Sequence, residues 1–213
     1  MKQYKVIKNE QIADGAYVLS FIRDFKFHAG QVVKLTLNKT LAPRMYSICS
    51  GTSEELVQLL YSIRHEGELT PKLSEIKAGD SILVSAPVGD FSSTNEAACW
   101  IAAGTGIAPF VSILKSGNKK DKMLIHGARH QKGFYFSEYI KSQLNSNYIQ
   151  CCSGNFLENT FNGRVTEYVR NIMNIELFQK YYICGSAEMV VETRDILISR
   201  GIPYQQILSE IYF

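Results

Sequence analysis

The sequence predicts two domains: an N-terminal antiparallel β-barrel of Greek-key type over residues 1–95 and a C-terminal α/β domain with a doubly wound parallel sheet over residues 96–213. Three observations predict this organisation. The N-terminal part consists of many short strands and a single short helix. From Ala97 onward, apolar strand-like runs alternate with helical periods, which is typical of parallel β–α units. The polar, turn-rich segment 87–96 separates the two patterns.

The barrel strands are rich in β-branched and aromatic residues and are separated by Gly- and Asp-containing turns. They are expected at residues 4–7, 16–21, 32–37, 45–49, 56–63 and 82–85. Residues 68–73 predict the one short helix, with Thr70 as its N-cap and Pro71 at its first position. Such a helix start exposes N–H groups to an anion, and Gly67 would let a phosphate approach the backbone closely.

The second half repeats one unit, a strand followed by a helix. The expected strands cover residues 97–102, 123–127, 148–152 and 181–184, and the expected helices cover residues 107–114, 136–144, 165–173 and 187–200. Gly201 ends the last helix, with Pro203 just beyond it. Repeated units of this kind form a parallel sheet with helices on both faces.

Composition excludes several classes of function. The formal net charge of +3 is too small to indicate nucleic-acid binding. No apolar run could span a bilayer and the N-terminus lacks a signal peptide, so we expect a cytoplasmic protein without a membrane partner. We also expect a monomer. The 5 cysteines contain no C-x-x-C and the 4 histidines are scattered, so no metal site is expected. The adjacent Cys151 and Cys152 are expected to be reduced and half-buried in a strand.

The chemistry of the first domain centres on Arg44-Met45-Tyr46-Ser47, which Pro43 directs into an extended strand. The planar fork of an arginine donates in pairs and suits a diphosphate. A tyrosine offers a flat amphipathic face to a heteroaromatic ring, and a serine offers a small donor and acceptor. From these residues alone, a cofactor site and an ordinary barrel strand with one exposed arginine remain equally open.

The motif RMYS resembles the flavin-binding Arg-x-Tyr-Ser of the ferredoxin-NADP reductase family. Three further motifs resemble the family in the same order, and the chain ends in EIYF like the family's closing Glu-x-aromatic. These motifs are GELTPKL (67–73), GTGIAPF (104–110) and YYICGSAEMV (181–190). The resemblance implies FAD in the barrel, NADP(H) in the α/β domain, hydride transfer between them, and single-electron exchange with ferredoxin or flavodoxin.

The resemblance also assigns residues to each cofactor. For FAD it implies Arg44, Tyr46, Ser47, Tyr61, Ile63, Gly67, Leu69, Thr70, Tyr212 and Phe213. For NADP it implies Gly104, Thr105, Gly106, Arg129, Arg164, Cys184 and Gly185. In the family a terminal aromatic stacks on the flavin, and Tyr212 aligns with it; which of the two terminal rings covers the isoalloxazine stays open.

Two departures bear on the nucleotide site. The GTG loop lacks the third Rossmann glycine and continues into Pro109, so it is not the common NAD fingerprint. Arg129 and Arg164 are candidates for the 2′-phosphate, but Gly154 stands where bacterial members often carry a further arginine. Each charge-assisted bond to a phosphate contributes on the order of 1.5–3 kcal/mol, so preference for NADPH over NADH is expected to be blunted.

The family's catalytic group corresponds to Ser47, Cys184 and Glu210. Hydride transfer needs no covalent bond to the protein. The protein has to hold the nicotinamide ring against the flavin ring and to stabilise the proton at flavin N5. Ser47 is expected to hydrogen-bond N5, Cys184 to pack against the nicotinamide, and Glu210 to adjust charge or relay a proton. Two alternatives stay open: an NADH-preferring reductase or reductase component of a multicomponent oxygenase or dehydrogenase, and a non-catalytic flavin-binding module.

Overall fold

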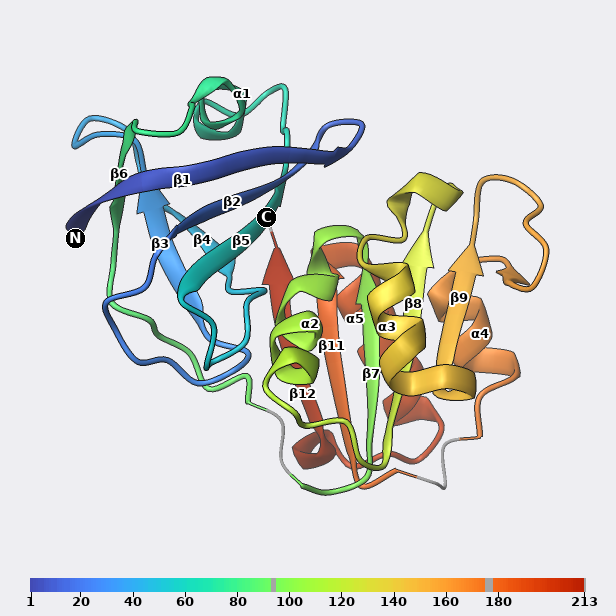
Figure 1. Cartoon of the computed structure of the whole chain (residues 1–213). Helices are drawn as coiled ribbons and strands as arrows, with labels where there is room; N and C mark the ends of the chain where they lie inside the picture. The colour runs from blue at the N-terminus through green and yellow to red at the C-terminus, as the bar shows by residue number, and fades with distance from the viewer. Residues whose placement is uncertain (93–94, 175–177, 213) are drawn as a thin grey trace. The chain divides into compact units, whose positions relative to one another are not determined.

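The computed structural model describes residues 1–92, 95–174 and 178–212. The chain divides into two compact units, Met1–Ser93 with Ala108–Gly117 and Thr94–Ile107 with Asn118–Phe213 (Figure 1). The predicted domain boundary between residues 95 and 96 stays a prediction, because the neighbouring residues 93 and 94 lie outside the described residues.

The first unit is built on a six-stranded antiparallel sheet. Its strands are β1 (Lys2–Ala13), β2 (Ala16–Ile22), β3 (Val32–Thr36), β4 (Arg44–Ser47), β5 (Leu56–Ser62) and β6 (Ser81–Val84), in the order β4-β3-β6-β1-β2-β5. The two ends of this order meet just beyond β4, where Ile48 bridges Leu59 and the N–H of Cys49 donates to the carbonyl of Gln58 at 2.8 Å. The sheet therefore curls towards closure, and the predicted antiparallel barrel is confirmed.

Alternating side chains fill the barrel. On β2, Leu19 and Phe21 are fully buried, and the strand pairs along its whole length with β5. Strand β1 is much longer than residues 4–7, because it pairs with β6 through its first residues and with β2 through the rest. Most of its side chains are polar and exposed, and only Val6 is buried, so its apolar pattern carries little signal for its length.

The short helix α1 (Leu69–Glu75) starts before the predicted position. Glu68 is its N-cap residue, so the prediction of Thr70 as N-cap is wrong. The hydroxyl of Thr70 instead accepts the backbone N–H of Arg64 at 2.8 Å and ties the preceding loop to the helix. Pro71 remains within the first turn, where its missing N–H leaves no intrahelical bond unmade.

The helix α2 (Ala108–Lys115) belongs to the first unit by its contacts. The hydroxyl of Ser112 donates to the carbonyl of Ser50 at 2.7 Å, and the ammonium of Lys115 reaches Gln58 at 2.9 Å and Glu54 at 3.3 Å. These bonds join the helix to the loop before β5 and to β5 itself.

The second unit is a six-stranded parallel sheet. Its strands are β7 (Ala98–Ala103), β8 (Lys122–Ala128), β9 (Tyr148–Cys152), β10 (Phe161–Asn162), β11 (Lys180–Ser186) and β12 (Ile207–Tyr212), in the order β10-β9-β8-β7-β11-β12. Helix α3 (Ser137–Leu144) lies on one face, and α4 (Val165–Asn171) and α5 (Ala187–Ser199) lie on the other (Figure 1). The predicted doubly wound sheet is confirmed, with β12 as a strand that was not predicted.

Buried side chains fill both faces of this sheet. Between the sheet and helices α4 and α5 lie Ile101, Ile183 and Val169, all fully buried. On β8, His126 is fully buried, with its Nδ1 2.8 Å from the hydroxyl of Tyr148. Burial lowers the pKa of His126 to about 3, so the imidazole is neutral at physiological pH.

Candidate functional site

The order of the parallel sheet reverses between β7 and β11, because the chain builds outward from β7 to β10 and then crosses back to β11. Open α/β sheets bind ligands at the carboxyl ends of their strands at such a point. The segment after β7 is the 3₁₀ turn Gly104–Ile107, and β11 ends in Cys184, Gly185 and Ser186. The fold therefore brings the two predicted nucleotide loops, around Gly104 and Cys184, to the same edge.

Two glycines shape the first of these loops. Gly104 has φ +57°, which L side chains adopt only at a cost, and it allows the turn out of β7. A Cβ on Gly106 would lie 2.2 Å from the carbonyl oxygen of Cys184. The main chain of β11 therefore packs directly against Gly106. The loop that also carries the half-buried Thr105 contacts β11 at this point.

Cys184 and Glu210 are brought together by the pairing of β11 with β12. They are register partners on the two parallel strands, and the Sγ of Cys184 lies 3.9 Å from Oε2 of Glu210. Cys184 is buried and Glu210 is half-buried. Ser47, the third residue of the predicted catalytic group, lies in the first unit.

Strand β4 carries the predicted flavin motif. Arg44 is exposed, while Tyr46 and Ser47 are buried, with 9% and 1% of their surfaces accessible. The ring of Tyr46 meets that of Tyr61 edge to face, with centroids 6.2 Å apart. Burial, opposed by the nearby charge of Arg44, raises the pKa of Tyr46 to about 12, so its phenol stays neutral. One strand therefore presents a cation, a neutral phenol and a hydroxyl.

The other predicted FAD residues divide between the core and the surface of the first unit. Tyr61 is almost fully buried, with its hydroxyl 3.0 Å from Oδ1 of Asn9, and Leu69 is buried in the same core. Ile63 is half-buried and Gly67 is exposed in the loop before α1. Their contacts with FAD stay predictions. The terminal-stacking prediction falls on the Tyr212 side chain and on Phe213, which lie outside the described residues.

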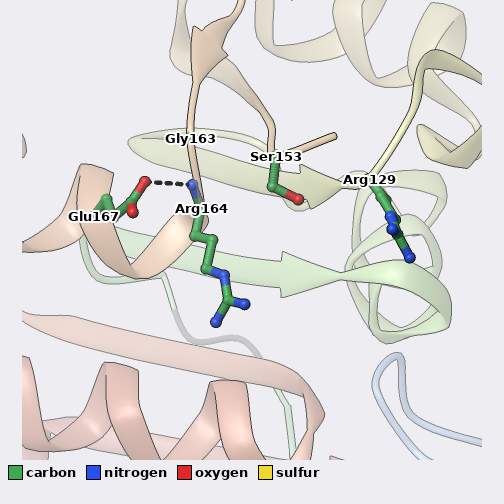
Figure 2. Close-up of a pocket in the computed structure, with 5 residues that line it drawn as sticks. All are labelled: Arg129, Ser153, Gly163, Arg164 and Glu167. Carbon is green, nitrogen blue, oxygen red and sulfur yellow. Dashed lines mark hydrogen bonds between the residues drawn. The ribbon is translucent and has the colours of Figure 1, made fainter. Parts of the chain in front are cut away.

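A hollow of about 470 Å³ lies at the carboxyl ends of β8, β9 and β10 (Figure 2). It is lined by Arg129, Ser153, Gly163, Arg164 and Glu167. Both predicted phosphate-binding arginines thus line one space, with an exposed serine hydroxyl beside them. Glu167 was not singled out from the sequence, although its place three residues after Arg164 is where a helix-capping carboxylate stands.

The two arginines differ in their surroundings. Arg129 makes no ion pair with any residue in the described part of the chain. Arg164 lies 3.8 Å from the carboxylate of Glu188, and both side chains are largely exposed. An exposed pair at this distance contributes between about 0 and 1 kcal/mol, so it can open for a ligand.

Gly154, where bacterial family members often carry an arginine, fills a tight position. Its N–H donates to the carbonyl of Arg129 at 2.8 Å. A Cβ at this glycine would lie 2.3 Å from the same carbonyl oxygen and 2.7 Å from the ring of His130. The backbone around Gly154 therefore leaves no room for the arginine side chain that the family pattern would place there.

Comparison with known proteins adds to this geometry. The profile of the oxidoreductase NAD-binding domain matches residues 100–195. A ferredoxin-NADP reductase of Azotobacter vinelandii is 26% identical over 219 residues, covering 87% of this chain and 83% of the relative. A flavodoxin/ferredoxin-NADP reductase of Buchnera aphidicola is 29% identical over 201 residues, covering 81% and 80%. The predicted resemblance to the ferredoxin/flavodoxin-NADP reductase family is therefore confirmed over most of the chain.

The chain is also similar to proteins with other names. A probable dihydroorotate dehydrogenase B (NAD(+)) electron transfer subunit of Methanocaldococcus jannaschii is 27% identical over 203 residues, covering 92% of this chain and 74% of the relative. A ferredoxin NADP⁺ reductase structure from Neisseria gonorrhoeae, solved with FAD and NADP, superposes with a TM-score of 0.88 at 20% identity, covering 100% and 98% of the chains. At that identity the structural match supports the fold alone.

Two features are absent from the described residues. None of the helices there has the length and apolar character needed to cross a membrane. No group of three or more His, Cys, Asp or Glu side chains there is arranged to hold a metal ion.

Proposed function

We propose that this chain is a flavin-dependent reductase that passes hydride between NADPH and FAD and single electrons between FAD and a ferredoxin or flavodoxin. One observation carries the proposal: at the switch point of the parallel sheet, the glycine loop packs on Cys184, whose Sγ lies 3.9 Å from the Glu210 carboxylate. At this edge, the glycine loop and the thiol can pack against a nicotinamide ring, and the carboxylate can accept or release a proton.

The residues of β4 fit FAD. The exposed guanidinium of Arg44 would hold the diphosphate, and the neutral phenol of Tyr46 would lie along the ring system and donate a hydrogen bond. FAD would supply the redox chemistry, since it accepts two electrons as hydride and releases them singly. The hydroxyl of Ser47 would stabilise the proton at flavin N5.

The residues of the second unit fit a dinucleotide. The hollow lined by Arg129 and Arg164 lies within the 300–1,000 Å³ typical of small-molecule sites, and its two cations suit a phosphorylated ribose. The glycine loop at Gly104 would carry the diphosphate, as in other α/β nucleotide sites. Cys184 would pack against the nicotinamide, and Glu210 would hold a proton or balance charge beside it.

An NADH-preferring reductase, or the reductase component of a larger enzyme, is the second candidate. It is favoured by the tight packing at Gly154, which leaves the hollow without a third arginine, and by the Glu188 carboxylate beside Arg164. It is also favoured by relatives named as NAD(+)-linked electron transfer subunits. A ratio of kcat/KM for the two nucleotides separates the candidates.

Two measurements test the proposal. Denaturation of the purified protein should release FAD, identified by mass. The FAD-loaded protein should then reduce a ferredoxin or flavodoxin with electrons from NADPH. The proposal is rejected if no FAD is released or if NADPH reduces neither carrier. We propose the cytoplasm as its compartment, in keeping with all five cysteines being free thiols, and a monomer as its state.

A further inference from the structure

The hollow beside Arg129 and Arg164 also contains a carboxylate. Glu167, on the first turn of α4, lines the same space (Figure 2). Glu188 lies 3.8 Å from Arg164, so the two arginines are matched by two carboxylates. A 2′-phosphate carries close to two negative charges at pH 7, so it would enter a hollow with little net positive charge.

Glu167 is held in place from two sides. Its Oε2 accepts the backbone N–H of Arg164 at 2.8 Å. The same oxygen occupies the space above Gly163, where a Cβ would lie only 2.4 Å away. Turning the carboxylate away would leave the Arg164 N–H without this acceptor, so Glu167 is a fixed part of the wall.

Gly154, next to the lining residue Ser153, cannot supply the missing positive charge. Gly154 sits on the carbonyl of Arg129, and a side chain added there would collide with it at 2.3 Å. The Sγ of Cys152 also lies 3.5 Å from this carbonyl, which fixes the main chain at the base of Arg129. Among the residues that line the hollow, Arg129, Arg164 and Glu167 carry its charge, and Glu188 pairs with Arg164.

We propose that Glu167 is a specificity-determining residue that limits the preference for a 2′-phosphate over a 2′-hydroxyl. This inference rests on the proposed function, because it takes the hollow as the site of the adenosine ribose. The carboxylate repels a phosphate dianion, and it accepts hydrogen bonds from ribose hydroxyls, which are donors. Acidic residues recognise the ribose diol in other dinucleotide sites for the same reason.

The test uses two nucleotide fragments, 2′,5′-ADP and 5′-AMP, which differ only in the 2′-phosphate. Their dissociation constants are measured by calorimetry on the flavin-loaded full-length protein, so hydride transfer is not needed. In the wild type, 2′,5′-ADP should bind less than about ten-fold more tightly than 5′-AMP, because one repulsive charge offsets one arginine contact. A larger wild-type ratio would overturn the proposal without any variant.

Glu167→Gln keeps an oxygen for the Arg164 N–H and removes only the charge. It should tighten 2′,5′-ADP on the order of five-fold and leave 5′-AMP unchanged or weaker. The gain should shrink at about 1 M salt, where charges are screened within about 3 Å. The control is Glu138→Gln on α3, an exposed carboxylate paired with Lys141, which should change neither constant.

The outcomes separate two failures. If the wild type binds neither fragment, the proposed nucleotide site itself is wrong. If the wild type binds both and Glu167→Gln changes both equally or neither, the proposed function stands and the role of Glu167 is rejected. Tighter binding of 2′,5′-ADP without tighter binding of 5′-AMP, absent in Glu138→Gln, supports the inference.

Discussion

The Sγ of Cys184 lies 3.9 Å from Oε2 of Glu210, because the two residues are register partners on neighbouring parallel strands. Their order in the sequence gives no sign of this contact, since 25 residues and helix α5 separate them. The contact depends on β12, the strand that returns the end of the chain to the sheet. It puts a titratable carboxylate next to a thiol at the switch point, and the catalytic predictions follow from it.

Glu210→Gln should slow hydride transfer from NADPH to FAD on the order of ten- to a hundred-fold, because the amide keeps the shape but cannot hold a proton. Binding of FAD and of NADPH should change little. Anaerobic stopped-flow absorbance gives the rate of flavin reduction, and Glu138→Gln on α3, an exposed carboxylate paired with Lys141, is the charge-matched control. An unchanged reduction rate would leave Glu210 with a structural role only.

Ser47→Ala should leave FAD bound and slow its reduction strongly, because the hydroxyl that we assign to flavin N5 is lost. Ser20, another buried serine of the barrel, provides the matched variant: Ser20→Ala should retain the wild-type rate. The flavin content and the reduction rate are measured on the same preparation. Equal rates for Ser47→Ala and Ser20→Ala would remove Ser47 from the catalytic group.

Gly154→Arg tests whether this position is a lost phosphate contact or a packing site. Simple restoration of the family's arginine would raise the preference for NADPH. The structure predicts no gain, because the new Cβ would meet the Arg129 carbonyl at 2.3 Å and displace the loop that carries Arg129. Gly154→Ala, which adds only the Cβ, should lower kcat/KM for NADPH as well. The packing account fails if the arginine variant gains NADPH preference while the alanine variant behaves as wild type.

His126 should make stability fall in mild acid. Its pKa is about 3 in the folded protein and near 6.5 when unfolded, so the unfolded chain binds more protons between these values. The stabilisation is complete above pH 6.5 and is lost as the pH falls towards 3, with a loss of about 2 kcal/mol at pH 5. Urea unfolding at pH 7 and pH 5 measures it.

His126→Asn removes this titration and keeps a polar group that can reach the Tyr148 hydroxyl. The variant should therefore lose about 2 kcal/mol less than the wild type between pH 7 and pH 5. Equal losses in the two proteins would mean that other groups carry the pH dependence.

Much of the fold follows from local patterns. The alternating strands around Leu19 and the strand–helix units after Ala97 were predictable, because their apolar periods match the faces that they bury. Strand β12 was not, since its sequence ILSEIY is short and partly polar and is held mainly by backbone pairing with β11. The full length of β1 was not predictable either, because most of its side chains are polar and exposed and the strand is held by backbone pairing with β2 and β6.

The candidate site divides in a similar way. The resemblance placed Cys184 and Glu210 in one group, and the pairing of β11 with β12 shows how the two side chains come into contact. Glu167 could not be recognised as part of the hollow, because a carboxylate at the start of a helix is usually a capping group, and only the turn at Gly163 places it beside the arginines.

The central claim is that NADPH reduces a flavin held by this chain. The most direct measurement is the visible spectrum of the purified protein, followed anaerobically as NADPH and then NADH are added. We predict a yellow protein whose flavin absorbance is bleached by NADPH at concentrations near that of the protein. A bound flavin that neither nucleotide bleaches would contradict the reductase account and leave a flavin-binding module in its place.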